Sequence, residues 1–526
     1  MTALSTFDLR SDVPIINIPR RYNAAVDFID RNLVLGRSDN TAVIDRDGSH
    51  TYGDLAQRVN RCGNALTALG LKQEDRVAMI MLDTVDFPAV FWGCIKAGII
   101  PIPLNTLLTS DDYRYILDDC RAATLIVSEE LLEKVEPLKD QAMFLENIIV
   151  SGTGGAYPTL GDLMSGSDPE LEAAATTCDD VAFWLYSSGS TGSPKGVMHC
   201  HSHLIQTAIL YGLGILGINE RDVLFSAAKL FFAYGLGNGM SFPYLAGATS
   251  VLLSDRPTPK DVLATIERHQ ATIFFGVPSL YASILADPAN QPTASSLRLR
   301  ACVSAGEALP QEIGRKCQQW FGAPVLDGIG STEMLHIFIS NRLDDVNYGS
   351  SGKPVPGYRA KLVNEQDHPI GINEIGELAV SGPSAAIAYW NQREKSHRTF
   401  RGEWTYTGDK YTTDRDGYYQ YCGRNDDMLK VSGQWVSPFE VEATLMQHEL
   451  VQEAAVVGQE DENQLLKPKA YVVLKPEAER SENLAAEIQN FVKSRIAMHK
   501  YPRWIEFIDS LPKTATGKIQ RYKLRN

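Results

Sequence analysis

The stretch Val181-Ala-Phe-Trp-Leu-Tyr-Ser-Ser-Gly-Ser-Thr-Gly-Ser-Pro-Lys195-Gly196 joins an apolar, strand-like run to a loop of small residues. Glycines let successive backbone N–H groups turn toward one anion. Hydroxyl donors and one positive charge are added by Ser187, Ser188, Ser190, Thr191 and Lys195. The loop lacks the G-x-x-x-x-G-K-[ST] spacing of a P-loop. A flexible Ser/Gly linker is the alternative, but it would not normally follow an apolar strand and end in Pro194-Lys195-Gly196. The stretch therefore predicts a polyphosphate-binding loop.

Outward from this loop, helix-like and strand-like segments alternate. Helical spacing of apolar residues is found over 54–69, 85–97 and 261–269, and buried-strand patterns over 76–82, 123–128, 147–150, 271–277, 297–304 and 325–329. This alternation predicts an α/β fold with βαβ units and largely parallel sheets. The glycine-punctuated strands around 355–380 predict a small barrel-like region.

The last hundred residues have the pattern of a separate, small α+β domain. Strands are expected over 454–458, 470–474 and 504–508, and a helix over 484–496. The polar, glycine-flanked segment 423–433 is typical of a domain boundary. We therefore predict an N-terminal domain over 1–425 and a C-terminal domain over 426–526.

Composition excludes several classes of function. The 526 residues carry a net charge of −14, which argues against nucleic acid or an anionic membrane surface as the main partner. No run reaches the roughly 18 to 20 apolar residues of a membrane span, and Met1–Arg21 has no apolar signal core. The eight cysteines show no CxxC pair, so we expect neither a zinc site nor disulfides, and a reducing cytoplasm.

The loop and five further motifs together resemble the adenylate-forming superfamily, which holds acyl-CoA synthetases, peptide-synthetase adenylation domains and beetle luciferases. The resemblance covers about residues 21–526. Besides the loop, it is carried by Ser304-Ala-Gly-Glu307, Asp327-Gly-Ile-Gly-Ser-Thr-Glu333, Trp404-Thr-Tyr-Thr-Gly-Asp409, Gly423-Arg-Asn-Asp-Asp-Met-Leu-Lys-Val-Ser-Gly433 and Leu511-Pro-Lys-Thr-Ala-Thr-Gly-Lys518-Ile-Gln-Arg521.

The resemblance implies an ATP site in the N-terminal domain. Thr332 would contact the α-phosphate, Glu333 would hold Mg²⁺, and Asp409 would bind both ribose hydroxyls. The remaining ATP contacts would be Ser187, Ser188, Gly189, Ser190, Thr191, Lys195, Ala305, Gly306, Glu307, Asp327, Gly328 and Arg424. Ile329 departs from the family pattern, since most relatives have an aromatic residue there that packs on adenine.

The resemblance also implies a mobile C-terminal domain that serves two half-reactions. Lys518 would be the catalytic lysine that bridges the substrate carboxylate and the α-phosphate. Asp426 falls at the family's hinge position. Gly433 and Lys430 would line the tunnel through which coenzyme A enters. Isolated surface lysines and aspartates are the alternative for each position.

The acid substrate is indicated by less general residues. The apolar stretch Ser226–Asn238 contains no carboxylate to pair with a substrate amine, so a neutral, flat acid fits better than an amino acid. This stretch and Gly330-Ser-Thr-Glu-Met-Leu-His-Ile-Phe338 are similar to benzoate–CoA ligases. By that likeness the aryl pocket would be walled by Phe232, Ala233, Tyr234, Gly330, His336 and Ile337, with simple core packing as the alternative.

The prediction is therefore an enzyme that joins an aromatic acid to CoA through an aroyl-AMP, with ATP, CoA and Mg²⁺. His336 would hydrogen-bond a ring substituent or the carboxylate. Benzoate, a hydroxybenzoate and an aminobenzoate stay open, as do a monomer and a homodimer. The rival functions are an enzyme that loads a carrier protein and a non-catalytic sensor of the nucleotide or the acid.

Overall fold

The computed structural model describes residues 4–187, 194–292, 296–425, 427–431, 434–462, 465–476, 478, 480–513 and 519–525. Its contacts divide the chain into two units. The first unit comprises 1–348, 354–359 and 381–405, and the second comprises 349–353, 360–380 and 406–526. The predicted boundary at residue 425 stays a prediction.

The Gly/Ser loop that follows Ser187 is closed at its base by two antiparallel strands of the first unit. These are β9 (Val181–Ser187) and β10 (Lys195–Cys200), and their register pairs Ser187 with Lys195. The two ends of the loop are therefore held side by side. β10 leads into α7 (His201–Thr207) and the π-helical turn η4 (Ala208–Leu213).

A nine-stranded, mainly parallel sheet forms one layer of the first unit. Its order is β17-β16-β15-β14-β13-β11-β12-β3-β4. The strands from β15 to β3 in this order run parallel, whereas β16 is antiparallel to β15 and β4 is antiparallel to β3. Its strands are β3 (Thr41–Asp45), β4 (Gly48–Thr51), β11 (Val223–Ser226), β12 (Thr249–Val251), β13 (Ile273–Gly276), β14 (Ala301–Ser304), β15 (Val325–Gly330), β16 (Ile337–Ser340) and β17 (Lys353–Pro354).

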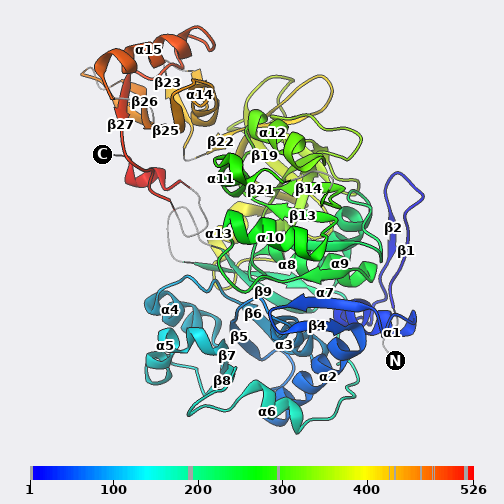
Figure 1. The fold of residues 1–526 in the computed structure, drawn as a ribbon. Coiled ribbons are helices and arrows are strands. Elements are labelled where there is room, and N and C mark those ends of the chain that lie inside the picture. Colours follow the sequence, from blue (N-terminus) through cyan, green and yellow to red (C-terminus); the bar gives the residue numbers. More distant parts are fainter. Residues whose placement is uncertain are drawn as a thin grey trace. The chain divides into compact units, whose positions relative to one another are not determined.

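Helices cover this sheet with apolar faces. Phe225, Phe274 and Cys302 of the strands pack with Ile266, Tyr281 and Phe321 of three helices, which lie over the sheet in Figure 1. These helices are α10 (Pro259–His269), α11 (Pro278–Leu285) and α12 (Gln311–Phe321). The segment between β11 and β12 contains α8 (Ala233–Leu236), η5 (Gly237–Ser241) and α9 (Phe242–Ala246).

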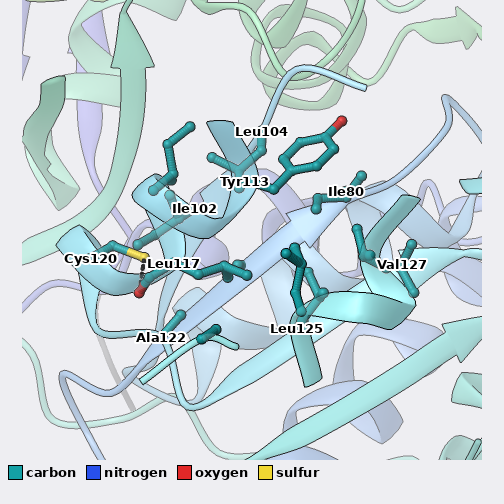
Figure 2. Packing of buried hydrophobic residues seen from close by; sticks show 14 of the residues in the cluster. Ile80, Ile102, Leu104, Tyr113, Leu117, Cys120, Ala122, Leu125 and Val127 are labelled. Atoms are coloured by element: carbon teal, nitrogen blue, oxygen red, sulfur yellow. Dashed lines mark hydrogen bonds between the residues drawn. The ribbon is translucent and has the colours of Figure 1, made fainter. Parts of the chain in front are cut away.

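A second, parallel sheet of the first unit has the order β6-β5-β7-β8. Figure 1 shows α4 and α5 on one side of it and α2 and α3 on the other, and Figure 2 shows α4 residues Tyr113 and Leu117 packed against Ile80, Leu125 and Val127 of the strands. The elements are α2 (Tyr52–Ala68), β5 (Arg76–Ile80), α3 (Asp86–Lys96), β6 (Ile100–Pro103), α4 (Ser110–Cys120), β7 (Thr124–Ser128), α5 (Leu132–Val135), β8 (Asn147–Ser151) and α6 (Leu160–Ser165).

Shorter elements complete the first unit at its N-terminus and near its end. They are the hairpin β1 (Thr6–Asp8) and β2 (Ile15–Asn17), the turn η1 (Val26–Asp30), α1 (Arg31–Val34), the single turn η8 (Thr332–Met334), α13 (Arg393–Thr399) and β20 (Phe400–Arg401). Among the described residues, no helix is both long and apolar enough to cross a membrane.

The second unit combines a small sheet with an α+β body. Strand β21 (Trp404–Thr413) enters it and pairs antiparallel with β22 (Tyr419–Arg424), and the same sheet holds β18 (Arg359–Val363) and β19 (Gly376–Ser381). The body is made of β23 (Leu429–Val431), β24 (Gln434–Val436), α14 (Pro438–Leu445), β25 (Val451–Glu460), β26 (Leu466–Leu474), α15 (Glu482–Lys493), β27 (Trp504–Phe507) and the turn η9 (Arg521–Lys523).

The predicted fold class is confirmed: parallel sheets with covering helices, and a separate α+β body at the C-terminus. The predicted strand 297–304 is the one most shortened, because only Ala301–Ser304 of it is β14. Leu297 and Leu299 instead pack as partly buried side chains on the core beneath α10. An apolar run there signals burial rather than an extended backbone.

Candidate active site

A charged cluster lies where β10 begins. The Lys195 Nζ is 3.2 Å from Oε1 of Glu333 and 3.8 Å from the centre of the Tyr389 ring. The Tyr389 hydroxyl donates a 2.7 Å hydrogen bond to the same carboxylate oxygen. Lys195 and Tyr389, which are far apart in sequence, therefore both contact Oε1 of Glu333.

Backbone pairing explains this convergence. Residues 387–390 run along β10, with Trp390 N–H donating to Gly196 O and Ile387 N–H to Met198 O. Val197 and Tyr389 form an antiparallel bridge. The N–H of Ala386 donates to Glu333 O at 2.7 Å. The segment 386–390 thus ties the turn of Glu333 to the strand of Lys195.

The Glu333 carboxyl is ionised in this setting. Burial by itself would raise its pKa, but the charge of Lys195 and the Tyr389 hydrogen bond outweigh burial, so that the pKa lies below its usual value. The side chains of Lys195 and Glu333 are only 18% and 16% exposed. A partly dry, ionised carboxylate beside an ammonium group is a suitable place for a phosphate and its counter-cation.

The turn that carries Thr332 and Glu333 is held from beneath by a buried histidine. His199 is 0% exposed and stacks on Phe183. Burial lowers the pKa of His199 to about 4, so the ring is neutral. Its Nε2 lies 2.8 Å from the Thr332 carbonyl, and because a carbonyl only accepts, Nε2 carries the proton and donates.

Strand β10 therefore contacts this turn at two neighbouring residues. Lys195 at its start reaches the Glu333 side chain, and His199, four residues later, reaches the Thr332 backbone. The His199 Nδ1 is 3.1 Å from Nδ1 of His203. The Cys200 N–H points at the same His203 Nδ1, at 3.3 Å, so this nitrogen is shared between two neighbours. The turn itself ends at Leu335, whose φ of +67° is rarely adopted by a branched residue.

Tyr234 and His336, two of the residues predicted to form the aryl pocket, lie together in the first unit with Tyr211 and Phe242, which were not predicted. His336 is 3% exposed and its ring lies 4.5 to 5.6 Å from those of Tyr211, Tyr234 and Phe242. The Tyr234 hydroxyl donates to the carbonyls of Gly276 and Val303, at 3.3 and 3.1 Å, which fixes its ring against the sheet.

His336 is neutral and has a defined proton position. Burial lowers its pKa to about 3. Its Nε2 is 3.1 Å from Asn238 Oδ1 and 3.3 Å from the Tyr234 carbonyl. Both partners accept when Nε2 donates, so the proton is on Nε2. A neutral ring with a bare Nδ1 accepts hydrogen bonds and offers no positive charge to a carboxylate.

The other predicted residues of the first unit lie around the carboxyl ends of the parallel strands, the usual ligand position in such sheets. The β13, β14 and β15 registers align Gly276 with Ser304, and Ser304 with Asp327. Ala305, Gly306 and Glu307 follow β14 directly, and Gly328, Ile329 and Gly330 complete β15. Ile337 pairs with Gly330 and is 2% exposed, while Phe232 and Ala233 begin α8.

Gly330 and Asp327 are constrained by close packing. A Cβ on Gly330 would lie 2.7 Å from the His336 carbonyl oxygen, so only glycine allows β15 and β16 to turn this closely. Asp327 is 5% exposed, and burial raises the pKa of its carboxyl well above the usual value.

Among the described residues, the buried Ser187 hydroxyl has no hydrogen-bond partner.

In the second unit, Asp409 and Arg424 face each other on neighbouring strands. They are register partners of β21 and β22, and Arg424 Nη1 donates to Asp409 Oδ1 at 3.0 Å. The Asp409 side chain is 13% exposed and that of Arg424 is 44% exposed. Gly408 has a φ of +74°, and a Cβ there would lie 3.0 Å from Arg424 Nη2. The predicted W-x-x-T-G-D motif therefore presents its aspartate next to an arginine.

Several predicted residues lie outside the described part of the chain. These are Ser188, Gly189, Ser190, Thr191, Asp426, Gly433 and Lys518. The backbone of Lys430 is in β23, but its side chain is likewise not described.

Two residues of the cluster were not predicted from the sequence. Tyr389 belongs to no motif considered, and only its pairing with β10 places it at Glu333. His199 has a weak signal in the alternation of β10, where a histidine at a buried position needs a polar partner.

Comparisons with known proteins show the family to which the chain belongs. The AMP-binding enzyme family matches residues 32–390 and the AMP-binding enzyme C-terminal domain matches residues 440–518. The chain is 57% identical to a benzoate–CoA ligase of Thauera aromatica over all of both chains. It is 51% identical to a 4-hydroxybenzoate–CoA/benzoate–CoA ligase of Rhodopseudomonas palustris, over 96% of this chain and 94% of that protein.

Solved structures show the same likeness. A benzoate CoA ligase from Burkholderia xenovorans LB400 has a TM-score of 0.90 and 50% identity, covering 96% of this chain and 100% of that one. The anthranilate CoA ligase AuaEII in complex with anthranoyl-AMP has a TM-score of 0.92 and 45% identity, covering 96% and 97%. On the family match and on full-length identity, this chain belongs to the AMP-binding, adenylate-forming enzyme family.

Proposed function

We propose that this protein joins benzoate or a substituted benzoate to coenzyme A through an aroyl-AMP, releasing AMP and pyrophosphate. The observation that carries the proposal is the pairing of Lys195 with an ionised, half-buried Glu333 at the base of the Gly/Ser loop. The full-length identity to benzoate–CoA ligases supports the choice of acid and thiol.

The first half-reaction needs positioning and charge stabilisation rather than a base. A benzoate is already ionised at neutral pH. Its oxygen attacks the α-phosphorus of ATP, the bond to the β-phosphate breaks, and pyrophosphate leaves. We propose that Lys195 and Thr332 hold the phosphates, and that Lys518 places a positive charge where negative charge develops.

The donor set at Glu333 fits Mg²⁺. Magnesium is usually held by one or two carboxylates together with substrate phosphates. Both protein contacts of the carboxylate described above use Oε1, and Glu333 is the residue that would hold the metal ion. When bound, Mg²⁺ would neutralise phosphate charge.

For the acid, the aromatic residues around His336 suit a flat ring. The sequence left open whether His336 binds the carboxylate or a ring substituent. We infer that it faces the ring, because a neutral histidine whose Nε2 proton is donated to Asn238 and the Tyr234 carbonyl cannot pair with an anion.

In the second half-reaction the CoA thiolate attacks the aroyl carbonyl carbon, and the bond to the AMP oxygen breaks. We propose that Asp409 and Arg424 hold the ribose or phosphate of the nucleotide, that Asp426 is the hinge, and that Gly433 and Lys430 line the tunnel for CoA. The proposed setting is the cytoplasm, with either a monomer or a homodimer.

The test is a substrate panel with purified protein. ATP, Mg²⁺, CoA and one of benzoate, 4-hydroxybenzoate or 2-aminobenzoate are incubated, and pyrophosphate and the aroyl-CoA are quantified. Free benzoyl-CoA is expected. Pyrophosphate without any free thioester would favour loading of a carrier protein. Nucleotide or acid binding without pyrophosphate release would favour a sensor.

A further inference from the structure

The segment between β11 and β12 is open to solvent only where three of the predicted pocket residues lie. Of residues 230–246, only Phe232, Ala233 and Tyr234 are partly exposed, and all others are buried. The Phe232 N–H donates to the Lys229 carbonyl at 3.0 Å, which closes a turn just before α8. The placement of Lys229 therefore determines where Phe232 lies.

The Lys229 ammonium group is held at the carboxyl ends of both parallel sheets of the first unit. Its Nζ donates to the carbonyls of three consecutive residues after β12, which are Leu253, Ser254 and Asp255, the last two at 3.2 and 2.7 Å. Three carbonyl acceptors match the three N–H donors of a protonated lysine. Asp83, which follows β5 of the second sheet, places its Oδ2 3.9 Å from the same Nζ.

Asp83 also holds the backbone of the turn. Its Oδ1 accepts the Leu230 N–H at 3.3 Å, next to the lysine whose charge it faces. The side chains of Lys229 and Asp83 are 18% and 3% exposed. Burial raises the pKa of the Asp83 carboxyl to about 6, against the opposing charge of Lys229. At neutral pH the carboxyl is therefore ionised, and the ammonium group has a nearby counter-charge.

We propose that Lys229, held by Asp83, is a positioning residue for the aromatic acid, because it anchors the turn that places Phe232. The proposal rests on the proposed function and on the predicted aryl pocket. The Tyr234 ring is fixed separately, by its hydroxyl on the sheet. Loss of the Lys229 anchor should therefore shift Phe232 relative to Tyr234 and loosen the grip on a flat ring.

The test compares the KM for benzoate with the KM for MgATP in the full chain. Lys229→Met keeps an unbranched side chain but removes every donor. A misplacement of about 1 Å can cost roughly 100-fold, but the backbone bond of the turn remains, so we expect the KM for benzoate to rise about 10-fold. The KM for MgATP should stay within about twofold of the wild-type value, since the variant removes no predicted ATP contact.

Asp83→Asn is the second variant. Its amide oxygen can still accept the Leu230 N–H, so only the charge that faces Lys229 is lost. The KM for benzoate should rise by less, about threefold, again with little change in the KM for MgATP.

Lys134→Met is the matched control. Lys134 of α5 donates to the Thr106 carbonyl at 3.0 Å in the same unit, so the chemical change is the same, and both KM values should stay as in the wild type. A merely structural role of Lys229 would lower the fraction of active enzyme, and hence kcat, without separating the two KM values.

Two results in Lys229→Met would overturn the proposal: equal rises of both KM values, or no rise of the KM for benzoate. If this variant does not fold, the same two results in Asp83→Asn decide the question. Wild-type protein that released no pyrophosphate would instead refute the proposed function, and with it the role of Lys229.

Discussion

The two units hold their charged candidate residues in different ways. In the first unit, Lys195, Glu333 and Tyr389 come from three distant segments, and their contacts are largely shielded from water. In the second, Asp409 and Arg424 are cross-strand neighbours, and the arginine is 44% exposed. Charge pairs strengthen as water is removed and weaken at the surface. Changes in the first cluster should therefore cost more than comparable changes at the second pair.

The largest effect is expected for Glu333→Gln. This variant removes the carboxylate but keeps the side-chain size, leaving Lys195 without its partner and Mg²⁺ without its proposed ligand. We expect the rate of pyrophosphate release with benzoate to fall by about 100- to 1,000-fold, the range for loss of one preorganised electrostatic group. The measurement is a continuous pyrophosphate assay at saturating MgATP.

Glu403→Gln is the control for this variant, because Glu403 forms an exposed ion pair with Arg359 in the same unit. It should retain wild-type activity. If pyrophosphate release by Glu333→Gln stayed within threefold of the wild-type rate, the Lys195–Glu333–Tyr389 cluster would have no role in adenylation. The structural difference between the two units would then have no effect on activity.

A smaller effect is expected for Tyr389→Phe. The aromatic ring beneath Lys195 is kept, and the hydroxyl is lost together with its hydrogen bond to the Glu333 carboxylate and its 3.4 Å contact with Thr399 Oγ1. Hydrogen bonds to charged groups contribute about 1.5 to 3 kcal/mol, which corresponds to roughly 10- to 100-fold in rate. We expect the lower end, about 10-fold, because Lys195 still holds the carboxylate. An unchanged rate would show that Lys195 alone orients Glu333.

Tyr389 also marks where prediction from sequence stopped. The strand 76–82 and the helix 54–69 could be predicted because their patterns are local: an apolar run and a 3.6-residue period. The polyphosphate-binding loop stays a prediction. Lys195 and Glu333 could be named because each belongs to a short motif. Their contact could not be derived, since it depends on the pairing of β9 with β10 and on the turn after β15.

Tyr389 and His199 lack such local patterns. Their positions follow from long-range pairing, of residues 387–390 with β10 and of His199 with the Thr332 carbonyl. The partner of Arg521 could not be predicted from the sequence for the same reason. Its sequence neighbours predict a catalytic loop, but its partner Glu442 is 79 residues away on α14. Partner choice over such distances is set by tertiary packing.

At the second pair, Asp409→Asn should have a moderate effect. The amide keeps the shape but loses the charge that faces Arg424 and, by our proposal, the ribose hydroxyls. Because the pair is partly solvated, we expect the KM for ATP to rise about 3- to 10-fold, equivalent to about 0.7 to 1.4 kcal/mol. A loss as large as that of Glu333→Gln would contradict the difference between the units.

The smallest effect concerns stability and pH rather than catalysis. His199, His201, His203 and His336 of the first unit are buried, and burial lowers the pKa of His199 and His201 to about 4 and of His336 to about 3, with His203 also well below its usual value. In the unfolded chain a histidine titrates near 6.5. Between these values the unfolded state binds more protons, so stability is present above about pH 6.5 and is lost as the pH falls toward 4.

His201→Gln isolates one member of this set away from the charged cluster. Its Nδ1 accepts the Ala24 N–H at 3.1 Å, which an amide oxygen can also accept. Each such histidine adds up to about 1.4 kcal/mol per pH unit to the slope of unfolding free energy against pH. Urea unfolding followed by tryptophan fluorescence at pH 7 and pH 5 should give a shallower pH dependence for His201→Gln than for the wild type. Equal slopes would mean that His201 is already protonated when the first unit is folded, in conflict with its burial and its role as an acceptor.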